Sequence, residues 1–257
     1  MIPLRDDIRS RTRPWVTYGL VAACTLVFFY QLFSELTDPR LDNVITFTWG
    51  MVPAEVVRGQ RLWTLITSMF LHGGFFHIIG NMLYLWIFGD NVEDALGRGW
   101  YILVYLGAGL FGSLLHLVMS GGLVHAPPPV GVAEMLEVAA RNPGALGELL
   151  FRYPLLRPMI GASGAISGVM GVYFVLFPRA RVLTLVPILF FIRIIYLPAF
   201  VLLGFWILLQ LFYGCSAAPG TGGVAYFAHI GGFVVGILVG LLARRRRRSQ
   251  GIWYDIS

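Results

Sequence analysis

Residues 161–168 read Gly-Ala-Ser-Gly-Ala-Ile-Ser-Gly, and they open an uncharged apolar stretch that continues to residue 177. Gly164 and Gly168 are four positions apart, which places both on one face of a helix. A stripe of small residues on a membrane helix lets a second helix approach closely. A matching stripe lies near the C-terminus, where residues 228–236 read Ala-His-Ile-Gly-Gly-Phe-Val-Val-Gly and Gly240 follows. These two stretches predict a pair of closely packed membrane helices.

The composition of the whole chain predicts a membrane protein. Apolar residues occupy 57% of its 257 positions, whereas Asp, Glu, Lys and Arg together occupy only 12%; soluble domains carry about 25% charged residues. A soluble fold of this size could not hide so much apolar surface from water. The two Cys, Cys24 and Cys215, are too few for a disulfide scaffold, and we expect two free thiols. We predict an all-α, multi-pass membrane protein with one helical bundle rather than two domains.

Six stretches are long enough, or nearly so, to cross the ~30 Å hydrocarbon core of a bilayer as helices, which takes about 20 residues. Asp, Glu and Arg are absent from residues 15–33 and from the other five stretches, as expected where a charge in mid-membrane is costly. The six predicted spans are residues 15–35, 73–89, 100–120, 161–177, 196–213 and 224–243.

The distribution of Arg predicts the orientation of this bundle. An even number of spans puts both termini on one side, and that side carries 13 of the 19 Arg residues. The positive-inside rule therefore places both termini in the cytoplasm. The Arg run at 244–248 is interpreted as an anchor on anionic lipid, so the bilayer is the expected partner and nucleic acid is not. The predicted organisation is a cytoplasmic segment at 1–14, a membrane domain at 15–243 and a cytoplasmic polybasic tail at 244–257.

Two predicted external loops are long. Residues 37–72 are expected to contain a partly embedded hairpin. Residues 121–160 form an insertion with two short helices split at Asn142-Pro143-Gly144. The Gly-rich loop at 214–223 has few side chains to hold it in place, and we expect it to be mobile.

Polar residues inside membrane spans are functional candidates, because the bilayer penalises them. His77 and Asn81 are four apart and share one face of the second span, Ser163 opens the fourth, and His229 lies near the start of the sixth. With a cytoplasmic N-terminus, these three spans all run from outside to inside. The four residues fall within about the first ten positions of their spans, which predicts one shared layer in the outer half of the membrane.

Among the known ways to hydrolyse a bond inside a bilayer, elimination favours serine chemistry. An aspartic mechanism needs two carboxylates at depth, and the predicted spans contain none. A zinc peptidase would use His-Glu-x-x-His and a third ligand. His72 and His77 are instead five apart on different helix faces, with no carboxylate between them. We therefore predict a Ser-His dyad with no metal.

The predicted roles follow from these positions. Ser163 attacks a carbonyl carbon after His229 takes its proton, and His229 later protonates the leaving amine. Because Ser163 opens a helix, free backbone N–H groups and the positive end of the helix dipole face the developing oxyanion. Asn81 and His77 are predicted to complete that oxyanion hole.

The same motifs resemble the three signatures of the rhomboid intramembrane serine proteases, in the same order. They are Gly161-Ala-Ser163-Gly164, His72-x4-His77-x3-Asn81 and Ala228-His229-x2-Gly232-x3-Gly236. The resemblance implies a six-transmembrane-helix rhomboid bundle, Ser163 and His229 as the catalytic pair, and His77 and Asn81 at the oxyanion hole. It also implies single-span membrane proteins as substrates, no cofactor, and places in the site for His72, Gly161 and Gly164.

Three features depart from the family pattern. The Trp-Arg pair common in its first external loop appears here as Trp63-Thr64, with Arg61 nearby as a substitute. Ser167 stands where many relatives have an aromatic residue that packs on the catalytic His, so we expect that His to be held less firmly. The insertion at 121–160 is longer than expected for the family.

Other functional classes are left open by the sequence. The main alternative is a non-catalytic rhomboid-like binder or chaperone of membrane proteins, although such relatives usually lose the Ser or the His and this chain keeps both. A small-solute transporter would show inverted repeats and broken helices near mid-membrane. The sequence shows neither, but Pro187 and Pro198 near the fifth span keep this class open. With no transit peptide visible, the expected location is a bacterial plasma membrane. The oligomeric state is not fixed by the sequence.

Overall fold

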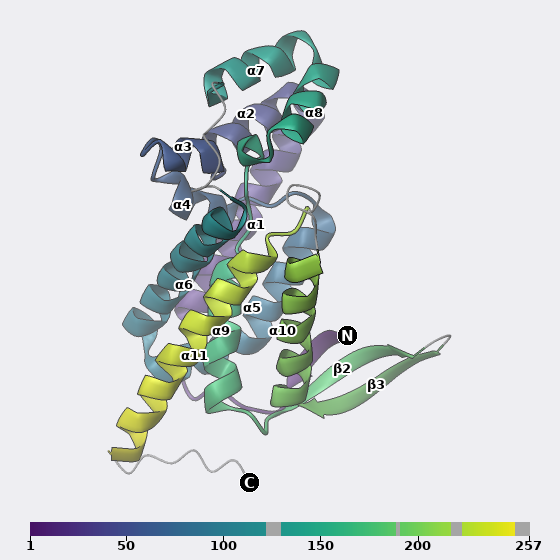
Figure 1. Ribbon diagram of the computed structural model, residues 1–257. Coiled ribbons are helices and arrows are strands. Elements are labelled where there is room, and N and C mark those ends of the chain that lie inside the picture. The colour runs from purple at the N-terminus through teal and green to yellow at the C-terminus, as the bar shows by residue number, and fades with distance from the viewer. Residues whose placement is uncertain (122–129, 189–190, 217–222, 250–257) are drawn as a thin grey trace.

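The computed structural model describes residues 1–121, 130–188, 191–216 and 223–249, and these are mostly helical (Figure 1). Parts of the predicted loop at 214–223, of the tail at 244–257 and of the insertion at 121–160 lie outside the described residues. The helices are α1 (Trp15–Thr37), α2 (Pro39–Trp49), α3 (Pro53–Val57), α4 (Thr64–Thr67), η1 (Ser68–Phe70), α5 (Phe75–Leu96), α6 (Arg98–Met119), α7 (Val132–Arg141), α8 (Pro143–Arg152), η2 (Pro154–Leu156), α9 (Ser163–Leu176), α10 (Ala199–Ser216) and α11 (Tyr226–Ser249). The strands are β1 (Ile2–Asp6), β2 (Arg181–Ile188) and β3 (Phe191–Pro198).

The six predicted spans coincide with α1, α5, α6, α9, α10 and α11. Within the described ranges, four segments are long and apolar enough to cross a membrane singly: α1, α6, α10 and Tyr226–Arg246 of α11. Helix α5 passes the same test together with α4 and η1, although the two parts meet at 94°. Helix α9 has only 14 residues, which is about 21 Å of helix. The fold is therefore a mostly helical membrane bundle with four to five candidate spans, and the count of six stays a prediction.

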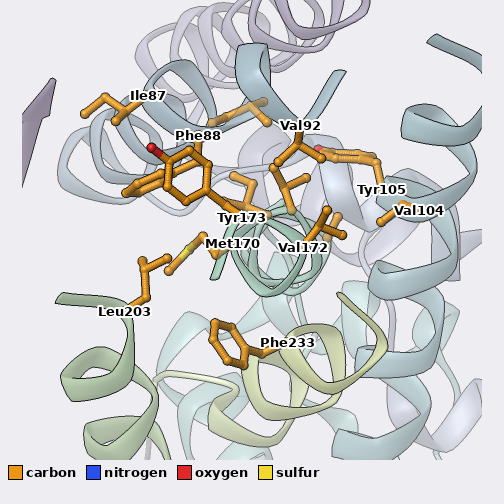
Figure 2. Close-up of a cluster of buried hydrophobic side chains, with 14 of the residues drawn as sticks. Ile87, Phe88, Val92, Val104, Tyr105, Met170, Val172, Tyr173, Leu203 and Phe233 are labelled. Atoms are coloured by element: carbon orange, nitrogen blue, oxygen red, sulfur yellow. The ribbon is translucent and has the colours of Figure 1, made fainter. Parts of the chain in front are cut away.

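Helix α9 lies at the centre of the bundle, packed among α5, α6, α10 and α11 (Figure 1). Its sequence is apolar on every side, as expected for a helix with no solvent-facing stripe, and nearly every residue from Gly164 to Leu176 is buried. Figure 2 shows Met170 and Tyr173 of α9 enclosed by side chains of the neighbouring helices, among them Phe88, Val92, Tyr105, Leu203 and Phe233. This core fixes the position of the start of α9.

The two glycine stripes meet as predicted. A Cβ atom at Gly232 of α11 would collide with the carbonyl oxygen of Gly164 of α9, and one at Gly236 would collide with that of Gly168. Further along, a Cβ at Gly240 would lie 2.9 Å from the Cβ of Val175. The backbones of α9 and α11 are thus in direct contact along the stripe, which is what small residues at membrane-helix interfaces allow.

The prediction of an all-α chain is wrong at one end of the bundle. Strands β1, β2 and β3 form an antiparallel sheet in that order, with Arg181 opposite Pro198 and Ile2 opposite Leu185. Residues 181–198 are rich in Val, Ile, Leu and aromatic residues, which favour a pleated strand. The spans predicted from the sequence leave residues 178–195 between the fourth and fifth spans and place residues 196–198 in the fifth. The first strand also comes from the distant N-terminus, so no local pattern announces the pairing.

The N-terminal segment is attached to the bundle by carboxylates. Glu93 is fully buried, and its oxygens accept hydrogen bonds from the backbone N–H groups of Val16 (3.0 Å) and Thr17 (2.8 Å), which cap the start of α1. On β1, Asp6 accepts hydrogen bonds from Asn91 of α5 (2.8 Å) and from the hydroxyl of Tyr173 of α9 (2.5 Å). The sheet and the C-terminal part of α11 lie at the same end of the bundle, opposite α7 and α8 (Figure 1).

The opposite end is formed by short helices. The two helices predicted within 121–160 are present as α7 and α8, and Asn142 caps α8 by accepting from the N–H of Gly144 at 3.1 Å. The segment 37–72, expected to hold a hairpin, contains α2, α3, α4 and η1. Its Arg61 donates from the guanidinium to the carbonyl oxygens of Phe47 (2.8 Å) and Thr48 at the end of α2. This Arg therefore holds α2 to the segment that leads into α4.

Candidate active site

Ser163 and His229 come together where α9 and α11 cross. Ser163 is the first residue of α9, and His229 lies in the first turn of α11. The close approach of Gly164 to the backbone of Ala228 brings these two helix starts together. Nε2 of His229 lies 2.7 Å from Oγ of Ser163, which is hydrogen-bond distance for a hydroxyl donating to an imidazole nitrogen.

Gln210 lies on the other side of this imidazole, and it was not predicted from the sequence as a site residue. Nδ1 of His229 lies 2.8 Å from Oε1 of Gln210, which is buried on α10. The amide nitrogen of Gln210 faces the carbonyl oxygen of Trp206, one turn earlier on the same helix, at 3.4 Å. A signal was available, because Gln210 is the one carboxamide in the predicted span at 196–213 and carries no charge. Only acidic residues had been considered as a group that could orient the imidazole.

An aromatic ring packs on His229, although it does not come from the position where family members often have one. Ser167 sits at that position and donates its hydroxyl to the carbonyl oxygen of Ser163 at 2.6 Å. The indole of Trp206 lies with its centroid 5.8 Å from that of His229, at an interplanar angle of 33°. Helix α10 therefore supplies both the ring beside His229 and the hydrogen-bond partner of its Nδ1.

His77 of α5 presents a hydrogen-bond donor. The backbone N–H of Gly73 donates to Nδ1 of His77 at 3.3 Å, so in the neutral ring the proton is on Nε2. Gly161 packs against that nitrogen: a Cβ there would lie 2.6 Å from Nε2 of His77. Gly161 also has a φ of +122°, a backbone conformation that favours glycine. This loop therefore needs a residue without a side chain.

Asn81 lies one turn further along α5 and is buried, with 8% of its surface exposed. Its amide nitrogen has no hydrogen-bond partner among the described residues. Buried polar groups are nearly always paired. An unpaired donor beside the Ser-His pair is therefore available to a ligand.

The other site candidates, His72 and Gly164, lie behind the site. The ring of His72 packs edge-on against that of His77, with centroids 5.1 Å apart. Its Nδ1 lies 3.2 Å from the carbonyl oxygen of Phe70, and its backbone N–H donates to Gln31 of α1 at 3.0 Å. His72 thus packs against His77 and is not among the residues that line the cavity beside Ser163. Gly164 serves the contact between α9 and α11.

A cavity of about 670 Å³ opens over the Ser-His pair. Its polar lining includes His77, Asn81, Ser163 and His229, and its apolar lining includes Trp206. Within the described ranges, the backbones of α5 and α10 hardly approach each other. The site therefore brings together a hydroxyl paired with an imidazole and two further donors beside a space that can hold a peptide segment.

The Rhomboid domain model matches residues 59–246 of the chain. The chain belongs to the rhomboid family. The match runs from the segment just before α4 to the Arg-rich end of α11, so it contains every residue of the candidate site. Strand β1 and helices α1 and α2 of this rhomboid lie before the matched region.

The chain is similar to several named proteins. This rhomboid is 31% identical over 237 residues to "RHOMBOID-like protein 12, mitochondrial" of Arabidopsis thaliana, covering 90% of this chain and 59% of that protein. It is 29% identical over 203 residues to "Rhomboid protein 1, mitochondrial" of Saccharomyces cerevisiae, covering 74% and 47%. It is 29% identical over 119 residues to "Rhomboid protease GlpG" of Salmonella choleraesuis, covering 46% and 40%. The chain spans about half the length of these relatives, which come from mitochondria as well as bacteria.

Proposed function

We propose that this rhomboid is an intramembrane serine endopeptidase in which Ser163 is the nucleophile and His229 is the general base. The observation that carries the proposal is the 2.7 Å separation between Oγ of Ser163 and Nε2 of His229. A serine hydroxyl is a weak nucleophile until a neighbouring base takes its proton, and this geometry supplies that base. The similarity to a relative that is named a protease supports the same activity.

The reaction proceeds in two halves. Ser163 Oγ forms a bond with the scissile carbonyl carbon while its proton moves to Nε2 of His229. That proton then passes to the leaving amine, the peptide C–N bond breaks, and an acyl-enzyme remains. Water from the cavity attacks the ester carbon and gives a proton to Nε2 of His229. The bond from that carbon to Ser163 Oγ then breaks, the proton returns to Oγ, and the carboxylic acid product leaves. No metal or cofactor takes part in this scheme.

The tetrahedral intermediates carry a negative charge on the former carbonyl oxygen. The unpaired amide nitrogen of Asn81 and the Nε2–H of His77 are the proposed side-chain donors to it. The first N–H groups of α9 are also available, since the start of a helix leaves its N–H groups without helical partners. Donors held in place before charge develops stabilise the transition state more than the ground state.

The proposed substrates are single-span transmembrane proteins. Their segment would reach the cavity sideways between α5 and α10, whose backbones hardly approach each other. Inside a helix, the carbonyl of a peptide bond is already engaged by an N–H group four residues later. Cleavage therefore requires local unwinding, which favours sites near a helix end with small or helix-breaking residues.

We propose the six-span arrangement with both termini in the cytoplasm, supported by the Arg distribution and by the common end of β1 and α11 in Figure 1. In this arrangement α9 crosses only part of the bilayer. Ser163 at its start then lies below the outer surface, under the cavity through which water enters. A bacterial plasma membrane is the proposed location.

A covalent serine probe tests the proposal on the purified protein in detergent. A fluorophosphonate should label Ser163 and no other serine, and labelling should be lost in His229→Ala as well as in Ser163→Ala. Labelling that persists in Ser163→Ala would refute the assignment of the nucleophile. No labelling of the wild-type protein, together with retained binding of transmembrane segments, would favour the non-catalytic binder.

A further inference from the structure

We propose that Gln210 is a positioning residue for His229: its amide oxygen holds the imidazole in the tautomer that can accept the proton of Ser163. The inference rests on the proposed function and adds a third member to the Ser-His pair. It gives α10 a role in orienting the imidazole, in addition to its place beside the proposed substrate route.

The hydrogen bonds determine the tautomer. Oε1 of Gln210 lies 2.8 Å from Nδ1 of His229, and an amide oxygen can only accept. Nδ1 must therefore carry the proton. A neutral imidazole has one N–H group, so Nε2 is left with a free lone pair, and it faces Oγ of Ser163 at 2.7 Å. This is the one neutral tautomer that can act as a base toward Ser163.

The orientation of the amide is itself fixed by the backbone. The nitrogen of Gln210 faces the carbonyl oxygen of Trp206, so the oxygen is turned to the imidazole. The reverse orientation would place an NH₂ group against Nδ1 and move the ring proton to Nε2, where it would block transfer from Ser163. In the serine-protease triad, an amide in place of the orienting carboxylate costs about 10⁴ in kcat through the wrong tautomer. Here the Trp206 carbonyl selects the productive one.

With a neutral group at Nδ1, only one proton is transferred during attack. During attack, the O–H bond of Ser163 breaks and the N–H bond at Nε2 of His229 forms. The Nδ1–H stays where it is, because an amide oxygen does not take the proton. Gln210 stabilises the imidazolium through its carbonyl dipole, without placing a carboxylate in the membrane, where an ionised group is costly.

A packing role does not account for Gln210. The helix α10 is otherwise dominated by apolar residues, and its other fully buried side chains are Ala199, Leu202 and Leu203. A buried carboxamide costs free energy unless it is hydrogen-bonded. Leu would fill nearly the same volume at no such cost. The amide therefore makes sense at this position through the bond to His229.

Three variants of the 257-residue chain separate the roles. Gln210→Leu keeps the volume and removes the acceptor, so kcat should fall about 10- to 100-fold with KM changed less than twofold. Gln210→Glu restores an acceptor for Nδ1–H and should recover most of that loss. Gly204→Ala is the control on the same helix, because a Cβ there meets only ordinary van der Waals contact with Phe174, so it should leave kcat unchanged. Fluorophosphonate labelling rates should follow the same order as kcat.

A spectroscopic measurement reads the tautomer without relying on turnover. In protein labelled with ¹⁵N-histidine, the ring nitrogens of His229 should show a protonated Nδ1 and an unprotonated Nε2, assigned by their loss in His229→Gln. Gln210→Leu should convert this pattern to a mixture of tautomers. Gln210→Asn, which shortens the reach by one methylene, should do so as well and serves where the Leu variant fails to fold.

Wild-type kcat in Gln210→Leu, or an unchanged His229 tautomer in that variant, would overturn the proposal. These outcomes differ from a failure of the proposed function. If Ser163→Ala still cleaved substrate, the Ser-His pair itself would be wrong, whereas a normal tautomer in Gln210→Leu with an inactive Ser163→Ala would remove only Gln210 from the mechanism.

Discussion

A side chain at Gly161 would strike the imidazole of His77, because a Cβ at Gly161 would lie 2.6 Å from Nε2. This contact joins the loop before the nucleophile to a proposed oxyanion donor. The N–H of Gly161 also donates to the carbonyl oxygen of Ser68 at 2.8 Å, so the loop cannot easily move away.

Gly161→Ala should therefore reduce activity more than stability. The new methyl group displaces His77, and φ of +122° strains any residue with a side chain. We expect kcat to fall about 10²- to 10³-fold, the range for loss of one oxyanion donor. Gly107→Ala on α6 is the matched control, since a Cβ there meets no neighbouring atom. Equal kcat values for the two variants would contradict the assignment of His77.

Asn81→Ala removes a donor that is unpaired in the resting protein. Because the bond forms with the oxyanion, the change should lower kcat by about 10²-fold or more while substrate affinity changes little. Asn81→Asp has similar size but presents an acceptor, so it should be at least as damaging. Steady-state kinetics with a transmembrane substrate separate the effect on kcat from the effect on KM. An effect confined to KM would reassign Asn81 to substrate binding.

Much of this arrangement was predictable from the sequence, because membrane chemistry limits where polar residues occur. Ser163 and His229 stand out as polar groups in apolar stretches, and the glycine stripes of α9 and α11 bring them together. Gln210 was missed because it is neutral and lies in a span of large apolar residues. The pairing of β1 with β2 was missed because it joins segments far apart in the chain, and long-range pairing leaves no periodic signal. The pairing of β2 with β3 is local, and the strand-favouring residues at 181–198 were an available signal for it.

The attachment of β1 should weaken as pH rises. Burial raises the pKa of the Asp6 carboxyl to about 7 from 3.8, against an opposing hydrogen bond from Tyr173 and with added repulsion from Asp90 and Asp7. Between these two values the folded state holds a proton that the unfolded chain has lost, so folding stability decreases with pH in this window and levels off above about 7. The Tm in detergent should fall between pH 5 and 8.

Asp6→Asn is the control for that dependence. The amide keeps most of the polar surface but does not titrate, so the slope of Tm against pH should flatten. A variant with the wild-type slope would show that Asp6 is not the group responsible.

Substrate access should depend on the separation of α5 and α10. Phe76 and Phe212 lie near the ends of these helices that are next to the site, and both are exposed, at 94% and 64%. A thiol crosslink between Phe76→Cys and Phe212→Cys, in a Cys215→Ser background, should block cleavage of a transmembrane substrate. A short soluble peptide that enters through the cavity should be cut more nearly normally. Equal cleavage of the membrane substrate before and after crosslinking would exclude this route.

The proposed substrate route between α5 and α10 and the proposed hydrogen bond between Gln210 and His229 are linked, because both involve α10. Outward movement of α10 would carry Gln210 and Trp206 away from His229. Loosening α10 through Leu202→Ala should therefore speed entry of a transmembrane substrate, whereas Trp206→Ala, which removes the ring beside His229, should lower kcat. If both variants changed the rate in the same direction, the separation of gating from positioning would be wrong.

The central claim is that Ser163 and His229 act as one catalytic unit. The most direct test compares wild type, Ser163→Ala, His229→Ala and the double variant, purified in detergent, on a single-span transmembrane substrate. Residues that act in one proton-transfer step are not additive, so the account predicts cleavage by wild type and equal, background-level cleavage by all three variants. Appreciable cleavage by Ser163→Ala, or no cleavage by the well-folded wild-type protein, would contradict it.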